Sequence, residues 1–270
     1  LFRSRLTSLV ANWIRVGYCQ GNFNSDNCAA GGFTLDYGPF GFCEQFDPNF
    51  QPWTGGGAHF SFFNQPLAAE ANYQMFWASL RPLLCDNKIA LKRFDHIREG
   101  FSETMNKKIE DMWSKKLGLP FYDENLLNKL LQLMVVSKVD YTIFFRKLSH
   151  IPKDISDLKD SFYLSGSDDV DAQWDSWLHQ WRNSLNTCGD IRTISNEMKK
   201  INPKYTWREW LIAPAYKKAE QGDYSLIKEL QIVLSNPYDE QSSEMEIKYD
   251  CLKPKEFFNA GGVSHYSCSS

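Results

Sequence analysis

The sequence predicts a mainly α-helical protein, and three observations support this fold class. From about Pro66 onward, apolar residues recur at spacings of three and four, which is the period of a helix with one buried face. Gly and Pro residues mark the ends of these periodic stretches. With 270 residues, of which 43% are hydrophobic, the chain is long enough to bury one large core or two modest ones.

The first helix is predicted at the N-terminus, where Leu6, Val10 and Trp13 fall on one helical face. The same segment contains Arg3 and Arg5, and the first 25 residues hold no acidic residue, a composition also found in mitochondrial transit peptides. Because the helical face leads directly into a motif region and the chain lacks an initiating Met, the sequence favours an internal helix of a longer chain.

Residues 19–64 are dense in Gly, Asn, Pro and Phe and are predicted to be loop-rich, with a small hairpin around 32–35. The periodic stretches that follow predict helices at 66–84, 88–117, 124–137, 140–148, 169–185, 191–200, 206–220 and 224–234. We expect 152–170 to be an internal linker and the tail from about Glu240 to lie on the surface without regular structure. The division expected is a first domain, a helical extension and a tail, at 1–150, 151–240 and 241–270.

Composition excludes several classes of function. The seven cysteines are odd in number, scattered and without a C-x-x-C pair, which argues against a disulfide framework or a structural zinc site. A net charge of -3 and no basic patch visible along the sequence predict no nucleic-acid partner, and the lack of an apolar run of about 18 residues predicts no membrane partner.

Three tryptophans at helical spacing, Trp174, Trp177 and Trp181, are expected in the core.

Two polar motifs in the loop-rich region are candidates for chemistry. The residues Asn-Ser-Asp-Asn occupy 24–27, and Asp36 follows nine positions after Asn27. A carboxylate and an amide oxygen on adjacent loops can bind Mg²⁺ and leave positions for phosphate oxygens. Asp26 would then orient or deprotonate an attacking hydroxyl group as a general base. The same residue types also cap turns, and on residue types alone a structural turn is the favoured interpretation.

The surrounding sequence resembles the selenoprotein O family, also called the YdiU or UPF0061 family. The family pattern His-Gly-x-x-Asn-Thr-Asp-Asn reads Gln-Gly-Asn-Phe-Asn-Ser-Asp-Asn at 20–27, and Leu-Thr-x-Asp-Tyr-Gly-Pro-Phe-Gly-Phe reads Phe-Thr-Leu-Asp-Tyr-Gly-Pro-Phe-Gly-Phe at 33–42. The resemblance spans nearly the whole chain and includes the final Cys-Ser-Ser at 268–270.

This resemblance implies a protein-kinase-like C-lobe followed by a helical C-terminal extension. It also implies transfer of AMP from ATP to Ser, Thr or Tyr hydroxyl groups of proteins, with Mg²⁺ as cofactor. Asp26 matches the proton acceptor, Asn27 a metal ligand, and Asp36 the metal ligand that holds the nucleotide through the metal. The chain contains no Gly-rich phosphate loop and no strand lysine, so the N-lobe is expected to be missing and the chain alone to be inactive.

Three positions depart from the family or kinase patterns. Gln20 stands where the family has His, which keeps a hydrogen-bonding side chain but loses a titratable group. Pro214 falls inside a predicted helix and is expected to kink it. The position of the kinase catalytic base is Asn22, which cannot accept a proton as a carboxylate does, so Asp26 is the nearby carboxylate for that role.

Several alternatives stay open at this point. A non-catalytic, nucleotide-binding pseudokinase scaffold and a kinase that transfers the γ-phosphoryl group are the two rival functions. Cys268 is a candidate redox residue that could pair with Cys28 or Cys43, and a free tail thiol is the other interpretation. The family resemblance implies a mitochondrial compartment for a eukaryotic protein and a cytoplasmic one for a bacterial protein.

Overall fold

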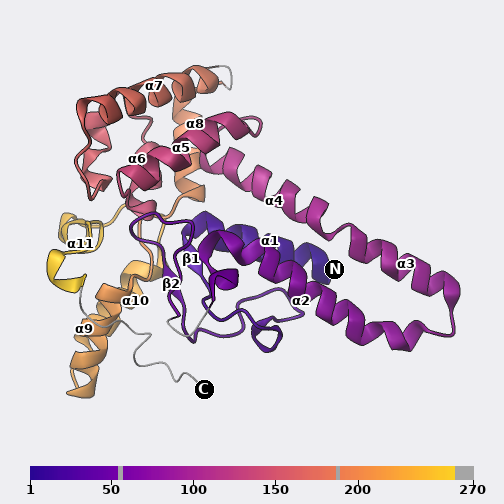
Figure 1. The fold of residues 1–270 in the computed structure, drawn as a ribbon. Coiled ribbons are helices and arrows are strands. Elements are labelled where there is room, and N and C mark those ends of the chain that lie inside the picture. Colours follow the sequence, from indigo (N-terminus) through magenta and orange to yellow (C-terminus); the bar gives the residue numbers. More distant parts are fainter. Residues whose placement is uncertain (54–56, 187–188, 259–270) are drawn as a thin grey trace.

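The computed structural model describes residues 1–53, 57–186 and 189–258, and the protein is mainly helical, as the sequence predicts (Figure 1). Within these residues, no helix has the length and apolarity needed to cross a membrane. The helices are α1 Phe2–Val16, α2 Gln65–Leu80, α3 Lys88–Glu99, α4 Phe101–Lys116, α5 Glu124–Val136, α6 Tyr141–Leu148, α7 Asp168–Leu185, α8 Ile191–Ile201, α9 Glu209–Glu220, α10 Ser225–Ser235 and α11 Ser243–Tyr249. The strands are β1 Tyr18–Cys19 and β2 Gly41–Phe42.

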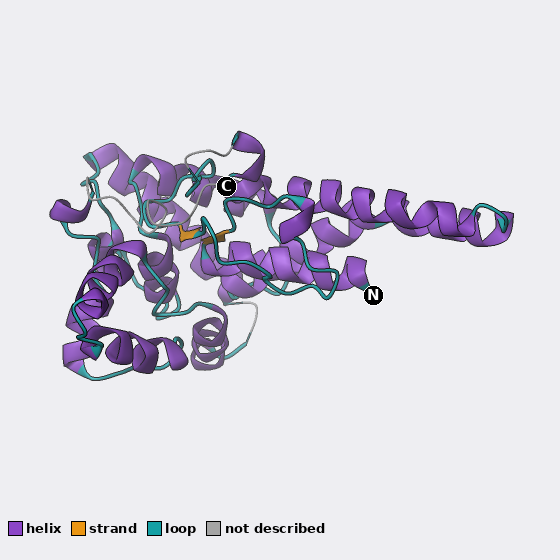
Figure 2. Cartoon of the chain, turned by 90° about the horizontal axis from the view of Figure 1, so that it is seen from below, coloured by secondary structure: helices purple, strands orange, loops and turns teal. Residues whose placement is uncertain are grey.

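Helix α3 and the adjoining ends of α2 and α4 form an arm that extends away from the rest of the molecule, whereas the other parts of α2 and α4 pack against α1 (Figures 1 and 2). The sequence predicts one helix over 88–117, but the structure divides it at Gly100 into α3 and α4. A Cβ atom at Gly100 would lie 2.5 Å from a guanidinium nitrogen of Arg3, which itself donates to the Ile97 carbonyl at 2.8 Å. The break therefore occurs at a glycine, where the Arg3 side chain lies against the backbone.

The main core lies between α4, α5, α6 and α7, and the three tryptophans of α7 are at its centre. Their indole nitrogens each donate a 2.9 Å hydrogen bond: Trp174 to the Ser137 hydroxyl, Trp177 to the Leu126 carbonyl and Trp181 to the Leu117 carbonyl. Each large apolar ring is thus buried with its one polar atom satisfied. The predicted core role of these tryptophans is confirmed.

The segment between α6 and α7 is not the linker that the sequence predicts. It forms two short 3-10 turns, Ile155–Asp157 and Lys159–Ser161, and Leu158 between them is fully buried. The Asp140 amide donates to the Ser161 carbonyl at 2.7 Å, which joins the segment to the start of α6. The few apolar residues of this segment have no helical period, yet they anchor it to the core. The main core therefore includes residues on both sides of position 150.

The chain after Glu240 has regular structure, which corrects the expectation of an irregular tail. Helix α11 begins after Ser242, whose hydroxyl accepts from the Met245 amide at 3.4 Å, and a 3-10 turn follows at Lys255–Phe257. Burial of Tyr249 and an ion pair of 2.7 Å between Lys204 and Glu246 hold α11 against the body. Contacts with distant residues, which a polar local sequence does not reveal, order this part of the chain.

Candidate active site

A two-stranded antiparallel pair places the two sequence motifs next to each other (Figure 1). Strand β1 pairs with β2 so that Tyr18 lies opposite Phe42 and Cys19 opposite Gly41. The first motif leaves β1, and the second leads into β2. The hairpin expected around 32–35 is wrong: within the described residues only an isolated bridge between Cys28 and Thr34 forms there. The strand pair instead joins β1, just before the first motif, to β2, the last two residues of the second.

The end of α1 is fixed immediately before β1. Gly17 ends the helix in the left-handed conformation, with φ at 81°, and its amide donates to the Ile14 carbonyl at 3.1 Å. The buried Tyr141 hydroxyl donates to the same carbonyl at 2.8 Å, and the Lys116 ammonium donates to the Arg15 carbonyl at 2.8 Å. The first motif therefore starts from a position held by α4 and α6.

Gln20 joins the two motifs directly. Its side-chain amide donates to the Asp36 carbonyl at 2.8 Å, and its side-chain oxygen accepts from the Tyr18 hydroxyl at 2.7 Å. Its backbone amide donates to the side-chain oxygen of Gln65 on α2 at 3.0 Å, and Gln65 donates in turn to the Tyr18 carbonyl at 2.9 Å. The residue that replaces the family's His is thus buried and anchors the second motif to the start of the first.

The first motif forms a 3-10 turn, Ser25–Asn27, which is also held by α2. The Ser25 hydroxyl donates to the Asn72 side chain at 2.9 Å, and the Asn72 amide donates to the Phe23 carbonyl at 2.8 Å. Asn27 donates through its side-chain nitrogen to the Asn22 carbonyl at 3.1 Å. This bond fixes which way the amide points, and the Asn27 side-chain oxygen accepts no hydrogen bond from any described residue.

Neither candidate carboxylate has a cationic partner among the described residues. Asp26 is exposed and Asp36 is half-buried, and neither side chain makes a hydrogen bond or ion pair with the described part of the chain. Gly38 leaves room for Asp36, because a Cβ atom there would lie 2.9 Å from a carboxylate oxygen. Burial is the main cause that raises the pKa of the Tyr18 hydroxyl, followed by the nearby Tyr37 and Cys19. The negative charge of Asp36 raises this pKa further, so Asp36 lies close to Tyr18.

The donor set fits Mg²⁺ better than a softer metal. Within the described ranges, no three His, Cys, Asp or Glu side chains gather at one position. The side-chain oxygens of Asn27 and Asp36 are hard ligands, and these two alone would not complete an octahedral shell. A metal held here would keep coordination positions for water or phosphate oxygens. The side chains of Asp26, Asn27 and Asp36 make no direct hydrogen bond with one another in the described structure.

The candidate redox site is incomplete in the described structure, because Cys268 lies outside the described residues. Of its two suggested partners, Cys28 is half-buried and Cys43 is fully buried. Burial raises the pKa of the Cys28 thiol to about 11 and raises the pKa of the Cys43 thiol as well. Both thiols are therefore protonated and weakly nucleophilic in this conformation.

The residues of α2 that support the site were not predicted from the sequence. Gln65 and Asn72 are buried polar residues seven positions apart on the same helix, which also buries Ala68 and Ala69. Two amides on an apolar helix face are a detectable signal, because a buried amide requires hydrogen-bond partners. Gln65 bonds to the Tyr18 carbonyl and the Gln20 backbone amide. Asn72 bonds to the Phe23 carbonyl and the Ser25 hydroxyl, so α2 positions both β1 and the first motif.

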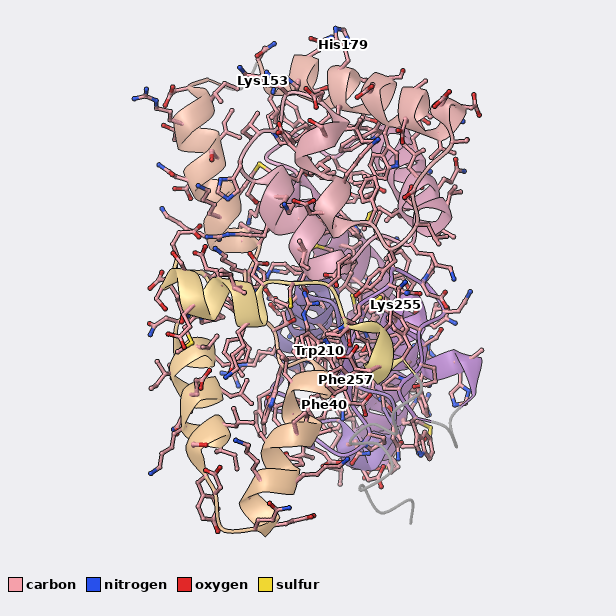
Figure 3. The ribbon with its side chains drawn as sticks, turned by 90° about the vertical axis from the view of Figure 1, so that its left-hand side faces the viewer. Phe40, Lys153, His179, Trp210, Lys255 and Phe257 are labelled. Carbon is pink, nitrogen blue, oxygen red and sulfur yellow. The ribbon has the colours of Figure 1, made fainter. Side chains whose placement is uncertain are left out.

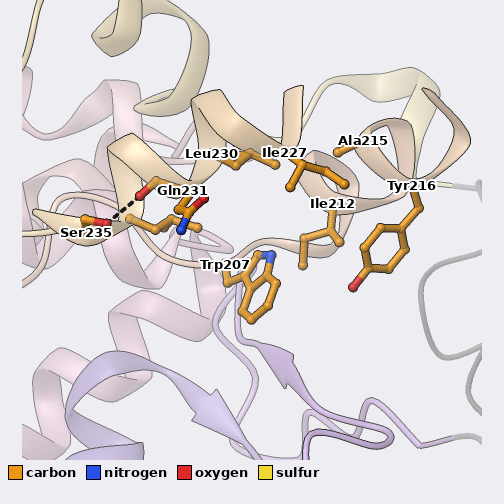
Figure 4. Close-up of a pocket in the computed structure, with 9 residues that line it drawn as sticks. Trp207, Ile212, Ala215, Tyr216, Ile227, Leu230, Gln231 and Ser235 are labelled. Atoms are coloured by element: carbon orange, nitrogen blue, oxygen red, sulfur yellow. Dashed lines mark hydrogen bonds between the residues drawn. The ribbon is translucent and has the colours of Figure 1, made fainter. Parts of the chain in front are cut away.

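An apolar groove also adjoins the second motif and was not predicted. The Trp207 ring packs 5.8 Å from the Phe40 ring, and Trp207 forms one wall of a groove of about 350 Å³ between α9 and α10 (Figure 4). Ile212, Ala215 and Leu230 contribute further apolar surface. The expected kink at Pro214 is not tested by these contacts, although α9 continues through it from Glu209 to Glu220.

Comparison with known proteins identifies the family. A family model described as protein adenylyltransferase SelO matches residues 2–235. Proteins named protein nucleotidyltransferase YdiU are similar to this chain: that of Aromatoleum aromaticum is 33% identical over 98% of the chain, that of Flavobacterium johnsoniae 31% over 97%, and that of Tolumonas auensis 33% over 97%. The chain spans about half of each relative, 52%, 52% and 51% of their lengths. The chain therefore belongs to the SelO family of protein nucleotidyltransferases.

Proposed function

We propose that this chain provides the general base and the metal ligands of an enzyme that transfers AMP from ATP to Ser, Thr or Tyr hydroxyl groups of proteins. The observation that carries the proposal is the Gln20 bridge, which joins the Asp36 segment to the loop that bears Asp26 and Asn27. Membership of the SelO family supports it. We also propose that residues 1–150 correspond to a kinase-like C-lobe, with a helical extension after them.

Asp36 and Asn27 would hold Mg²⁺, because their side-chain oxygens are free of other partners in the described structure. When bound, Mg²⁺ neutralises charge on the phosphate chain of ATP. The chain's own contribution is to fix these oxygens. The hydrogen bond from Asn27 to the Asn22 carbonyl sets the amide, and the Gln20 bond to the Asp36 carbonyl sets the second motif.

Asp26 is the group that would accept the proton from the substrate hydroxyl. In the proposed step, the hydroxyl oxygen forms a bond to the α-phosphorus of ATP, and the bond from that phosphorus to the oxygen bridging the β-phosphorus breaks. Pyrophosphate leaves with the bonding electrons, and the hydroxyl proton passes to the Asp26 carboxylate. An exposed carboxylate with no cationic partner in the described part of the chain is available for this transfer.

The test measures label transfer by the full-length protein from ATP labelled in either the α- or the γ-phosphate. We expect label from the α-phosphate only, and loss of about 100-fold or more with Asp26→Asn or Asp36→Asn, because general-base and electrostatic contributions have this size. Asp86→Asn is the matched control, since Asp86 is an exposed carboxylate without a partner in the described chain. Melting temperatures of all variants check that they fold.

Mass spectrometry of the modified substrate separates the rival functions. Addition of a phosphoryl group in place of AMP would identify a kinase. Nucleotide binding without any transfer would identify a non-catalytic scaffold. Full activity of the Asp26→Asn variant would remove Asp26 from the proposed role. Because the compared relatives come from bacteria, we propose that the protein is cytoplasmic.

A further inference from the structure

A basic pocket lies between α1, α4 and α8, apart from the residues of the candidate active site. It has a volume of about 390 Å³, and four of its lining residues are cations, Arg15, Lys108, Lys115 and Lys200. Asp111 is the single carboxylate among its lining residues. The chain as a whole has a net charge of -3, so this excess of positive charge is local. The cations come from three helices that are far apart in the sequence.

Three of the four cations have no carboxylate partner in the described structure. Lys200 forms a 2.6 Å ion pair with the exposed Glu197, whereas Arg15, Lys108 and Lys115 form none. Burial is the main cause that lowers the pKa of the neighbouring Lys116, and the positive charge of Arg15 lowers it further. Like charges held this close together oppose one another, and a bound anion would relieve that repulsion.

The Arg15 side chain is oriented by neutral acceptors. Its Nε donates to the Asn12 side chain at 2.8 Å, and one terminal nitrogen donates to the Ile201 carbonyl at 2.5 Å and to the Tyr238 hydroxyl at 2.9 Å. Its other terminal nitrogen makes no hydrogen bond within the described residues. A guanidinium held in this way retains donors and its full charge for a ligand, without the cost of ordering a free side chain.

A structural role explains only part of this arrangement. Arg15, Lys115 and Lys200 lie in the last turns of α1, α4 and α8, where a cation offsets the negative end of the helix dipole. Lys108 lies in the middle of α4, and Arg15 bonds to a carbonyl of another segment. The helix dipole therefore accounts for three of the four charges, but it does not explain Lys108 or why all four line one pocket.

We propose that this pocket binds a small phosphate-bearing anion, either free pyrophosphate or the polyphosphate group of a nucleotide. Lysine and arginine side chains are the usual ligands of such groups, and each charge-assisted hydrogen bond is about twice as strong as a neutral one. The volume of about 390 Å³ admits an anion of this class and is too small for a folded partner. This site is independent of the proposed catalytic metal site.

The test is binding of pyrophosphate, ATP and adenosine to the chain by calorimetry, in EDTA and in an Asp36→Asn background. These conditions remove the contribution of the proposed metal site. We expect pyrophosphate and ATP to bind and adenosine not to bind, with an affinity that falls as salt rises. The double variant Lys108→Gln, Lys115→Glu should weaken binding by about tenfold or more, because two charge-assisted contacts are lost.

The matched control is Lys217→Glu, because Lys217 is an exposed lysine in the last turn of α9, as Lys115 is in α4. It reverses one charge at the same kind of position but outside the pocket, and it should leave binding unchanged. Absence of pyrophosphate binding at millimolar concentration would overturn the proposal. Equal weakening by the control and the pocket variants, or binding of adenosine as tight as that of ATP, would overturn it as well.

Discussion

Glu44, two residues after the second motif, is a partly buried carboxylate without a full set of partners in the described structure. One of its oxygens has no hydrogen-bond partner in the described structure, and neither has the indole nitrogen of Trp210. Lys253 lies 3.9 Å from the other oxygen. Trp210 packs 5.6 Å from Phe257 in the last described turn, and Figure 3 shows these two residues side by side. Glu44 therefore lies where the C-terminal segment covers the body.

Burial raises the pKa of Glu44 to about 7, although the nearby Arg208 and Lys253 lower it in part. Between pH 4.5 and about 7, Glu44 is therefore protonated in the folded chain and ionised in the unfolded chain. The free energy of unfolding consequently falls as the pH rises through this range. We expect Glu44→Gln to remove this fall and to stabilise the protein above pH 7 by on the order of 1–3 kcal/mol.

Urea unfolding at pH 5 and pH 8 measures the effect of Glu44→Gln. Glu110→Gln serves as control, because Glu110 is exposed on α4. The same pH dependence in Glu44→Gln as in the unchanged protein would contradict the assignment of this titration to Glu44.

At the scale of elements, Lys116 connects three helical segments at the end of α4. Its ammonium donates to the Arg15 carbonyl at 2.8 Å and to the Asn202 side chain at 2.9 Å, and it lies 3.8 Å from the centre of the Phe145 ring. Asn202 donates back to the Lys116 carbonyl at 2.9 Å and to the Ser149 hydroxyl at 3.0 Å. Burial lowers the pKa of Lys116, and the charge of Arg15 lowers it further.

Lys116→Met should destabilise the protein by about 2–4 kcal/mol, because two buried acceptors lose their donor. The length of the side chain is conserved, so the loss comes from hydrogen bonds and charge more than from volume. Denaturant unfolding measures it, with the exposed Lys107→Met on the same helix as the comparison. Similar stability of the two variants would show that the Lys116 contacts contribute little.

At the scale of the whole molecule, the main core joins the first 150 residues to those that follow. Leu158 and the three tryptophans of α7 are buried in the same cluster as residues of α4, α5 and α6. Tryptophan buries about 150–250 Å² per residue, at roughly 25 cal/mol per Å². Three such residues thus contribute on the order of 10 kcal/mol, which is comparable to the stability of a whole domain.

We therefore expect residues 1–150, expressed alone, to lack a cooperative unfolding transition, whereas residues 1–258 should unfold cooperatively. Near-ultraviolet circular dichroism and thermal melting of the two fragments measure this difference. A cooperative transition in 1–150 would show that this part is an independent domain, as the sequence-based division supposes.

Local periodicity was enough to predict most helices, because their apolar residues face one core. The helices α5 and α7 lie within one residue of the predicted bounds. The division at Gly100 was not predicted, because a single glycine inside a periodic stretch is also compatible with one continuous helix. Helix α11 and the packed segment around Leu158 were not predicted either, because contacts with distant residues order them and their sequences have no local helical period.

For the candidate site, the order and flanking residues of the motifs by themselves indicated the SelO family, which the family model confirms. They also led to the proposal that Asp26, Asn27 and Asp36 are the functional residues. The tertiary structure decided how those residues are held, through Gln20 and the amides of α2, and it gathered the four cations of the basic pocket. The physical reason is the range of the interactions. A motif consists of residues that are adjacent in the sequence. A hydrogen bond from α2, or a pocket between α1, α4 and α8, instead depends on tertiary packing that no short stretch of sequence specifies.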